Sequence, residues 1–113
     1  MAKVEIVEDL KNEVFRKFKG ESLIVFRFMR SLGENPRKGK FLGRVGGLAI
    51  KEMKYKNFRF YFIVDENKLK IFSQTELKDL LIKFVRMSNK KDQQETINEI
   101  KKILLIIGAN GFK

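Results

Sequence analysis

The chain contains no cysteine and no histidine among its 113 residues. Without cysteine it can form neither a disulfide nor a thiolate nucleophile. Without histidine it lacks the commonest general base and the commonest metal ligand. Any catalysis must therefore use lysine, arginine, tyrosine, aspartate, glutamate, serine or backbone groups.

Long apolar segments are missing as well. No run of 18 apolar residues could form a transmembrane helix, and the opening MAKVEIVEDL lacks the apolar centre of a signal peptide. We therefore expect a cytoplasmic protein without a membrane partner. A hydrophobic fraction of 43%, including eleven phenylalanines, is typical of a single packed domain over residues 1–113.

The net charge of +11 is concentrated in two segments. Residues 36–63 hold eight basic residues and one acid, and residues 83–91 hold four basic residues and no acid. In the remaining segments the signs nearly cancel. Such clusters favour a polyanionic partner, either a nucleic acid or an acidic protein segment. A lysine-rich surface without any such partner stays an alternative.

Hydrophobic periodicity predicts an α+β domain. We expect an edge strand over 3–6, a hairpin of helices over 7–18 and 21–33, and a long basic loop over 34–47. Strands are expected over 48–55, 58–65, 68–73 and 81–88, with helical turns near 75–81 and a final helix over 92–107. The tail, residues 108–113, is expected to be loose. This order predicts helices packed on a small, mainly antiparallel sheet.

The stretch KEMKYKNFRFYFIVD, residues 51–65, reads as two strands joined by a two-residue turn at Lys56-Asn57. This turn pairs Lys54 with Arg59, and two like charges that face each other across a ladder are destabilising. A phosphate bound between the two cations would explain the pair, because arginine binds phosphate bidentately and lysine acts as a point charge. A solvated basic hairpin neutralised by Glu52 is the alternative.

Side chains alternate between the two faces of this hairpin. The first face is apolar, as expected for a core, and carries Met53, Tyr55, Phe58, Phe60, Phe62 and Val64. The second face is mixed and carries Ile50, Glu52, Lys54, Arg59, Tyr61 and Ile63. A carboxylate, two cations and a phenol on one face favour a site for an anionic group.

Three stretches and the order of the elements resemble the RelE/ParE toxin superfamily of toxin–antitoxin systems. LGENPRKGKFL is similar to the family's segment with a Pro and a Gly-Lys-x-Leu. GLAIKEMKYKNFRFYFIVD is similar to its Gly-Leu, Glu-x-Arg/Lys and Tyr/Phe-Arg pattern. FVRMSNKKDQQETINEIKKIL is similar to the Phe-x-Lys-Lys segment and last helix of the HigB-like branch. The resemblance spans residues 3–107 and implies a RelE/ParE-like fold, with an N-terminal helical hairpin and a C-terminal helix on the sheet.

For the ribonuclease branch, the resemblance implies a ribosome-associated mRNA endoribonuclease that needs no metal or other cofactor. In that mechanism the 2′-hydroxyl attacks the neighbouring phosphate. The matching catalytic positions are Glu52, Lys54, Arg59 and Arg86, with Glu52 as base or positioning group. The matching RNA-binding positions are Lys38, Lys40, Lys51, Tyr61, Lys90 and Lys91. The implied partners are the ribosome, its mRNA and a cognate acidic antitoxin.

The sequence also departs from that family pattern. Several active members place a tyrosine or histidine near the C-terminus, whereas here no tyrosine follows Tyr61. Strand parity puts Arg86 on the same side as Phe84, so Arg86 reaches the mixed face only if a bulge intervenes. Residues 74–81 form an insertion relative to short members. A second hypothesis therefore stays open: a non-catalytic or ParE-like member that binds a protein target such as gyrase, an antitoxin or nucleic acid.

Overall fold

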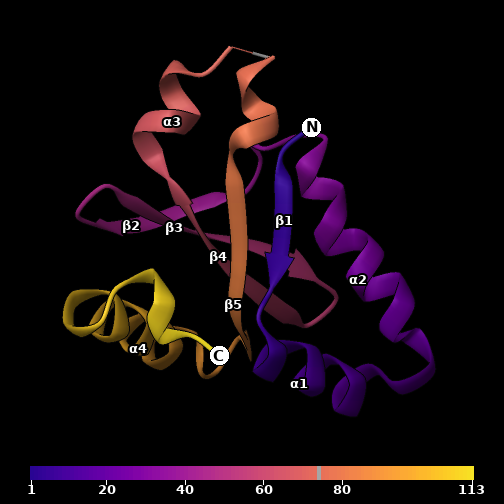
Figure 1. Cartoon of the computed structure of the whole chain (residues 1–113). Coiled ribbons are helices and arrows are strands. Elements are labelled where there is room, and N and C mark those ends of the chain that lie inside the picture. Colours follow the sequence, from indigo (N-terminus) through magenta and orange to yellow (C-terminus); the bar gives the residue numbers. More distant parts are fainter. Residues whose placement is uncertain (74) are drawn as a thin grey trace.

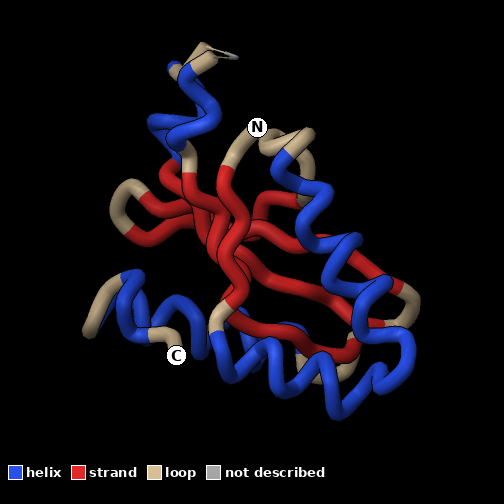
Figure 2. Tube along the Cα trace, turned by 45° about the vertical axis from the view of Figure 1, so that its right-hand side comes forward, coloured by secondary structure: helices blue, strands red, loops and turns tan. Residues whose placement is uncertain are grey.

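A computed structural model describes residues 1–73 and 75–113, which form a twisted sheet with helices on both faces (Figures 1 and 2). The strands are β1 (Lys3–Ile6), β2 (Lys40–Val45), β3 (Leu48–Tyr55), β4 (Phe58–Asp65) and β5 (Leu81–Asn89). Their order across the sheet is β1-β5-β4-β3-β2, and only β1 and β5 run parallel. The helices are α1 (Glu8–Phe18), α2 (Ser22–Arg30), α3 (Glu66–Ile71) and α4 (Gln93–Ile106). The predicted α+β class, with a mainly antiparallel sheet, is confirmed.

The α1–α2 hairpin forms because each helix has an apolar stripe to bury. Leu10 and Val14 of α1 are buried four residues apart, and Val25 and Met29 of α2 show the same spacing. This spacing places each pair on one side of its helix. The chain leaves α1 at Lys19, whose φ of 46° lies in the left-handed region and ends the helix.

Helices cover both faces of the sheet. On one face the Phe18 ring of α1 packs against Tyr55 and Phe58, with centroid distances of 5.8 and 5.2 Å. Glu52 points to the other face, because side chains alternate along β3. There Gln93, the first residue of α4, hydrogen-bonds to Glu52. Figure 1 shows α2 and α4 on opposite sides of the sheet.

Two segments adopt a different secondary structure from the one predicted. Residues 40–45, expected within a loop, form β2 and pair with β3. Pairing along β3 overrides the turn preference of Gly43 in this segment. Residues 68–71, expected in a strand, belong to α3, because the Asp65 carboxylate caps this helix by accepting a hydrogen bond from the Lys68 amide at 3.0 Å.

The C-terminal segment is packed rather than loose, which corrects the expectation for residues 108–113. Phe112 is buried with 5% exposure, and the Asp9 amide donates a hydrogen bond to the Lys113 carbonyl oxygen at 2.7 Å. Phe112, the second-to-last residue of the chain, packs into an apolar site that local periodicity does not reveal. Within residues 1–73 and 75–113, no helix has both the length and the apolarity to cross a membrane.

Candidate functional site

The β3–β4 hairpin has the register predicted from the sequence. Lys54 pairs with Arg59, and Glu52 pairs with Tyr61. The two-residue turn begins with Lys56, whose φ is 53°. Two like charges therefore do face each other across the ladder, at the end of the sheet where β3 turns into β4.

Helix α4 covers the mixed face, for which the sequence predicts a site for an anionic group. Glu52 is 3% exposed, Arg59 is 8% exposed and Tyr61 is fully buried. The Nε atom of Arg59 lies 3.8 Å from Oε2 of Glu52, a distance typical of an ion pair but too long for a hydrogen bond. Gln93 donates a hydrogen bond to the same carboxylate oxygen at 3.4 Å. The apolar stripe of α4 has to be buried, and burying it on this face removes the pair from solvent.

The burial of Tyr61 corrects its prediction as an RNA contact. Its hydroxyl group shares a hydrogen bond of 2.8 Å with the Ser88 hydroxyl, and Ser88 donates to the Asn89 carbonyl oxygen at 2.9 Å. Burial raises the pKa of the Tyr61 phenol. Beside it, Nε of Arg59 is the only fully buried side-chain nitrogen or oxygen without a hydrogen bond in the described part of the chain.

A groove lies beside this pair, at the outer edge of β3. Strand β2 begins at Lys40, opposite Glu52, so β3 has no paired strand on that side from Met53 to Tyr55. The groove there has a volume of about 450 Å³, and we call it the edge groove. It is lined by Phe28, Lys38, Gly39, Lys40, Glu52, Met53 and Lys54. Four of the predicted site residues, Lys38, Lys40, Glu52 and Lys54, thus come together around one groove.

The loop that carries Lys38 is tied to the sheet by Lys51. This lysine is 6% exposed, and its Nζ donates a hydrogen bond to the Arg37 carbonyl oxygen at 3.0 Å. Burial lowers the pKa of the Lys51 ammonium group. Lys51 points to the face opposite Glu52, so its prediction as an RNA contact is corrected. It holds the loop instead.

Gly39 allows the same loop to approach the sheet closely. Its φ of +108° lies in a region that other residues rarely adopt. A Cβ atom at this position would come within 2.7 Å of Cζ of Phe62, a core ring of β4. A glycine is therefore needed where the loop turns into β2, between Lys38 and Lys40.

Ion pairs neutralise several cations of the 36–63 cluster. Three of them lie within 4.0 Å of a carboxylate: Arg44 with Glu66, Lys56 with Glu21, and Arg59 with Glu52. The exposed residues Lys38, Lys40 and Lys54 form no such pair within residues 1–73 and 75–113. Three exposed cations of this cluster without such a pair therefore lie together at the edge groove, and Arg37, which is also exposed, lies just outside it.

A bulge in β5 turns Arg86 toward the mixed face, as its prediction required. Tyr61 pairs with Arg86, the next residue of β4 pairs with Phe84, and Val85 is left unpaired. The Arg86 side chain nevertheless makes its contacts with α4 and the C-terminal segment rather than with Glu52 or Arg59. Its Nε donates to Glu99 of α4 at 2.6 Å, and its guanidinium group lies 5.1 Å from the centroid of the Phe112 ring.

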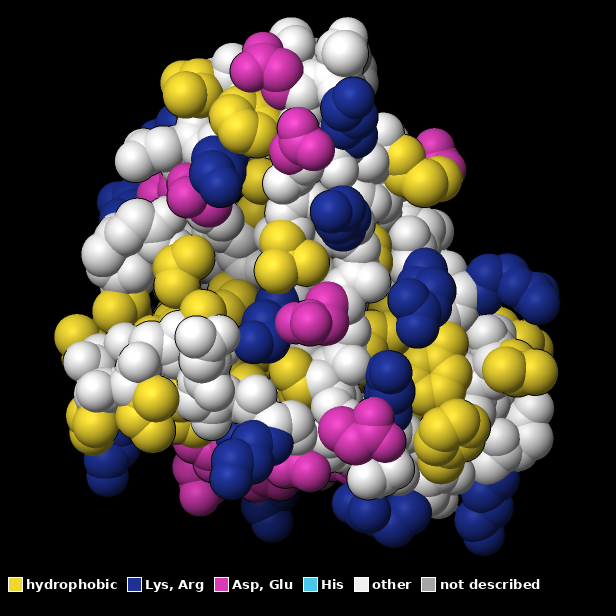
Figure 3. Space-filling model, in the orientation of Figure 1, with side chains coloured by type: hydrophobic (Ala, Val, Ile, Leu, Met, Phe, Trp, Pro, Cys, Tyr) yellow, Lys and Arg dark blue, Asp and Glu magenta, His cyan; other side chains and the backbone are white. Residues whose placement is uncertain are grey.

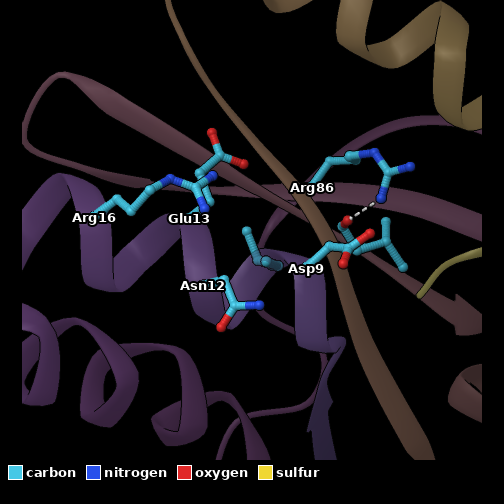
Figure 4. Close-up of a pocket in the computed structure, with 7 residues that line it drawn as sticks. Asp9, Asn12, Glu13, Arg16 and Arg86 are labelled. Atoms are coloured by element: carbon cyan, nitrogen blue, oxygen red, sulfur yellow. Dashed lines mark hydrogen bonds between the residues drawn. The ribbon is translucent and has the colours of Figure 1, made fainter.

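Arg86 lines a cleft of its own, separate from the edge groove (Figure 4). This cleft has a volume of about 350 Å³ and is lined by Asp9, Leu10, Asn12, Glu13, Arg16, Val85 and Arg86. Figure 4 shows the carboxylates of Asp9 and Glu13 among the cations Arg16 and Arg86. Burial raises the pKa of Glu13. Because the charges are mixed, the cleft attracts a phosphate less than the edge groove does.

Lys90 and Lys91 are exposed between β5 and α4 and do not line the edge groove. On the face that carries β1 and β5, Figure 3 shows Lys and Arg side chains interspersed with Asp and Glu. That face therefore forms no continuous basic surface. Phe28 and Gln93 were not predicted as site residues, because Phe28 lies within the predicted helix over 21–33 and nothing local indicates that Gln93 reaches Glu52.

The chain matches no protein-family model, and neither a curated protein sequence nor a solved structure is significantly similar to it. Among the described residues, no group of three or more acidic side chains is arranged to hold a metal ion. The function must therefore be argued from the edge groove and its neighbours.

Proposed function

We propose that the protein binds single-stranded RNA in the edge groove and cleaves mRNA on the ribosome, as a RelE/HigB-like toxin does. One observation carries the proposal: Lys38, Lys40 and Lys54 surround one groove without a carboxylate partner in the described residues. Three ammonium groups suit a phosphate backbone, and the Phe28 ring at the same groove offers a face on which a base can stack. The resemblance of the hairpin and the last helix to that family supports the same reading.

In the proposed reaction, the 2′-hydroxyl oxygen forms a bond to the adjacent phosphorus, and the bond from phosphorus to the 5′ oxygen breaks. Glu52 takes the proton of the 2′-hydroxyl, and water protonates the leaving 5′ oxygen. Lys54 stabilises the charge that develops on the phosphoryl oxygens. Arg59 is the ion-pair partner of that carboxylate, at 3.8 Å.

A second candidate is a binding protein without catalysis, acting on a protein target, an acidic antitoxin or nucleic acid. It is favoured by the position of α4, which leaves only 3% of Glu52 and 8% of Arg59 exposed. A base must reach the proton it abstracts. If α4 stays in place, the groove binds RNA through its lysines and no cleavage follows.

Binding is tested with a triple variant, Lys38→Gln/Lys40→Gln/Lys54→Gln. A matched triple variant, Lys68→Gln/Lys78→Gln/Lys102→Gln, removes the same charge from exposed positions outside the groove. Affinity for a single-stranded RNA is measured against salt concentration. The groove variant should reduce the slope of log K against log salt by about 2, because each phosphate contact on a single strand contributes ~0.7. Equal slopes for the two variants would refute the groove as the RNA site.

Cleavage is tested with translating ribosomes and purified protein. Wild-type protein should cut the mRNA, with or without EDTA, and a 2′-deoxynucleotide at the cut position should block the reaction. Lys54→Ala should lower the cleavage rate about 10²–10³-fold while the fold persists, because Lys54 is exposed. A wild-type protein that binds ribosomes but leaves the mRNA intact would establish the second candidate instead.

A further inference from the structure

A second hollow adjoins the edge groove, on the other side of Lys38. It has a volume of about 430 Å³, and we call it the turn hollow. It is lined by Glu34, Asn35, Pro36, Arg37, Lys38 and Leu77. This volume lies within the range of about 300–1,000 Å³ that is typical of small-molecule sites. Because Lys38 lines both cavities, the turn hollow is the immediate neighbour of the edge groove.

The floor of the turn hollow is a rigid turn. The Lys38 amide donates a hydrogen bond to the Asn35 carbonyl oxygen at 3.0 Å, which closes a four-residue turn with Pro36 in its second position. Two contacts hold Arg37 in place. Its carbonyl oxygen accepts from Lys51, and its Nη2 donates to the Phe72 carbonyl oxygen at 3.2 Å. A ligand would therefore meet a site that is already formed, and little ordering of the loop would oppose its binding.

The chemistry of the turn hollow differs from that of the edge groove. Glu34 is exposed, and its carboxylate forms no hydrogen bond or ion pair with any of residues 1–73 and 75–113. The Asn35 side chain is exposed as well and offers both donors and an acceptor. Pro36 and Leu77 supply apolar walls and are both buried. Apolar walls with a carboxylate and an amide at the rim suit a nucleobase rather than a phosphate.

We propose that the turn hollow binds the base of the nucleotide next to the phosphate held in the edge groove, and that Glu34 selects bases with an exocyclic amino group. This inference rests on the proposed RNA binding and adds base specificity to it. A carboxylate only accepts hydrogen bonds, so it pairs with the amino groups of cytosine, adenine or guanine. Uracil presents carbonyl oxygens and a single N–H, and its oxygens are repelled by the carboxylate. The wall at Leu77 belongs to residues 74–81, the segment that distinguishes this chain from short members of the family it resembles.

The test uses two short single-stranded RNAs, tetracytidylate and tetrauridylate, and amide NMR spectra of the full chain. Both tetramers should shift the amide signals of Lys38 and Lys54 in the edge groove. Tetracytidylate should also shift the signals of Glu34 and Asn35, and it should bind about tenfold more tightly than tetrauridylate.

The variant Glu34→Gln tests the selecting group itself. Its amide can donate to uracil and accept from cytosine, so the two tetramers should then bind within about twofold of each other. Asp79→Asn is the matched control, because Asp79 is exposed on the short 3₁₀ helix Glu76–Asp79 that also carries Leu77, and it does not line the hollow. It should keep the tenfold preference.

The two proposals fail in different ways. Equal affinity of the wild-type protein for both tetramers, with shifts confined to the edge groove, would overturn the base site and leave RNA binding standing. A preference for cytosine that survives Glu34→Gln would also overturn it, because another group would be the selector. If neither tetramer shifts any signal, the RNA-binding proposal and the base site are both refuted.

Discussion

Because Glu52 and Arg59 are buried together, removing one of them should destabilise the fold, whereas removing a charge from an open basic face should not. Glu52 is 3% exposed and Arg59 is 8% exposed, so water solvates their charges very little. At the 3.8 Å that separates Nε of Arg59 from Oε2 of Glu52, two unit charges attract by about 4 kcal/mol at an effective dielectric constant of about 20. Desolvation of both groups offsets most of this attraction, so the intact pair contributes little net stability.

Removing one partner leaves the other charge buried and unpaired. We therefore expect Arg59→Met to lower the free energy of unfolding by about 3–5 kcal/mol. Replacing both partners, in Glu52→Met/Arg59→Met, should recover most of that loss, because neither buried charge remains. Lys54→Met is the control. Lys54 is exposed and faces Arg59 across the ladder, so its removal should change stability by no more than about 0.5 kcal/mol and relieve a repulsion.

Urea unfolding at neutral pH measures these differences, and the double-mutant cycle separates the pair from other effects. Equal unfolding midpoints for Arg59→Met and Lys54→Met would refute the reasoning. That result would mean that α4 does not cover Arg59 in solution, and it would leave the pair open to a phosphate. A large loss for Arg59→Met without recovery in the double variant would assign the stability to the packing of the arginine stem rather than to its charge.

Three further predictions concern the loop, the tail and an ion pair. Gly39→Ala should destabilise the fold by about 1–3 kcal/mol in urea unfolding, since its φ of +108° disfavours a side chain, and a neutral result would show that the loop can shift away from Phe62. Phe112→Ala should lower the free energy of unfolding by about 3–5 kcal/mol if the tail is packed, and by far less if the tail is loose. Hydrogen bonds from Arg44 lower the pKa of Glu66 from 4.5 to about 2, so this pair stabilises the folded state above about pH 4.5 and loses that effect as the pH falls toward about 2. The difference in urea midpoint between wild type and Arg44→Gln should therefore shrink over that range, and a constant difference would contradict it.

Local pattern predicted those features that depend on neighbours in the sequence. The alternation in residues 51–65 and the two-residue turn at Lys56-Asn57 were sufficient for the register of β3 and β4. The stripes of Leu10 and Val14, and of Val25 and Met29, were sufficient for the helical hairpin. These features follow from fixed periods of two and about 3.6 residues, which any reader of the sequence can count. The absence of cysteine and histidine likewise excluded whole classes of chemistry before any fold was known.

Other features required contacts between distant segments. The mixed face, predicted as a site for an anionic group, is covered by α4, whose residues Ile97, Ile100 and Leu104 are buried in the core. The sequence of the hairpin does not indicate which helix will pack on it. The bulge at Val85 is similar, because it depends on how β5 pairs with β4 rather than on the composition of β5.

The sequence by itself determined the charge, the elements of the hairpin and which residues share a face of it. Only the tertiary structure decided which of the cations remain free. Lys51 is drawn inward to the Arg37 carbonyl oxygen, and Arg44 is neutralised by Glu66, 22 residues away. Lys38 and Lys54 are exposed at the edge groove and have no ion-pair partner among the described residues. The physical reason is that charge is additive along a chain, whereas its burial and pairing depend on the positions of groups in space.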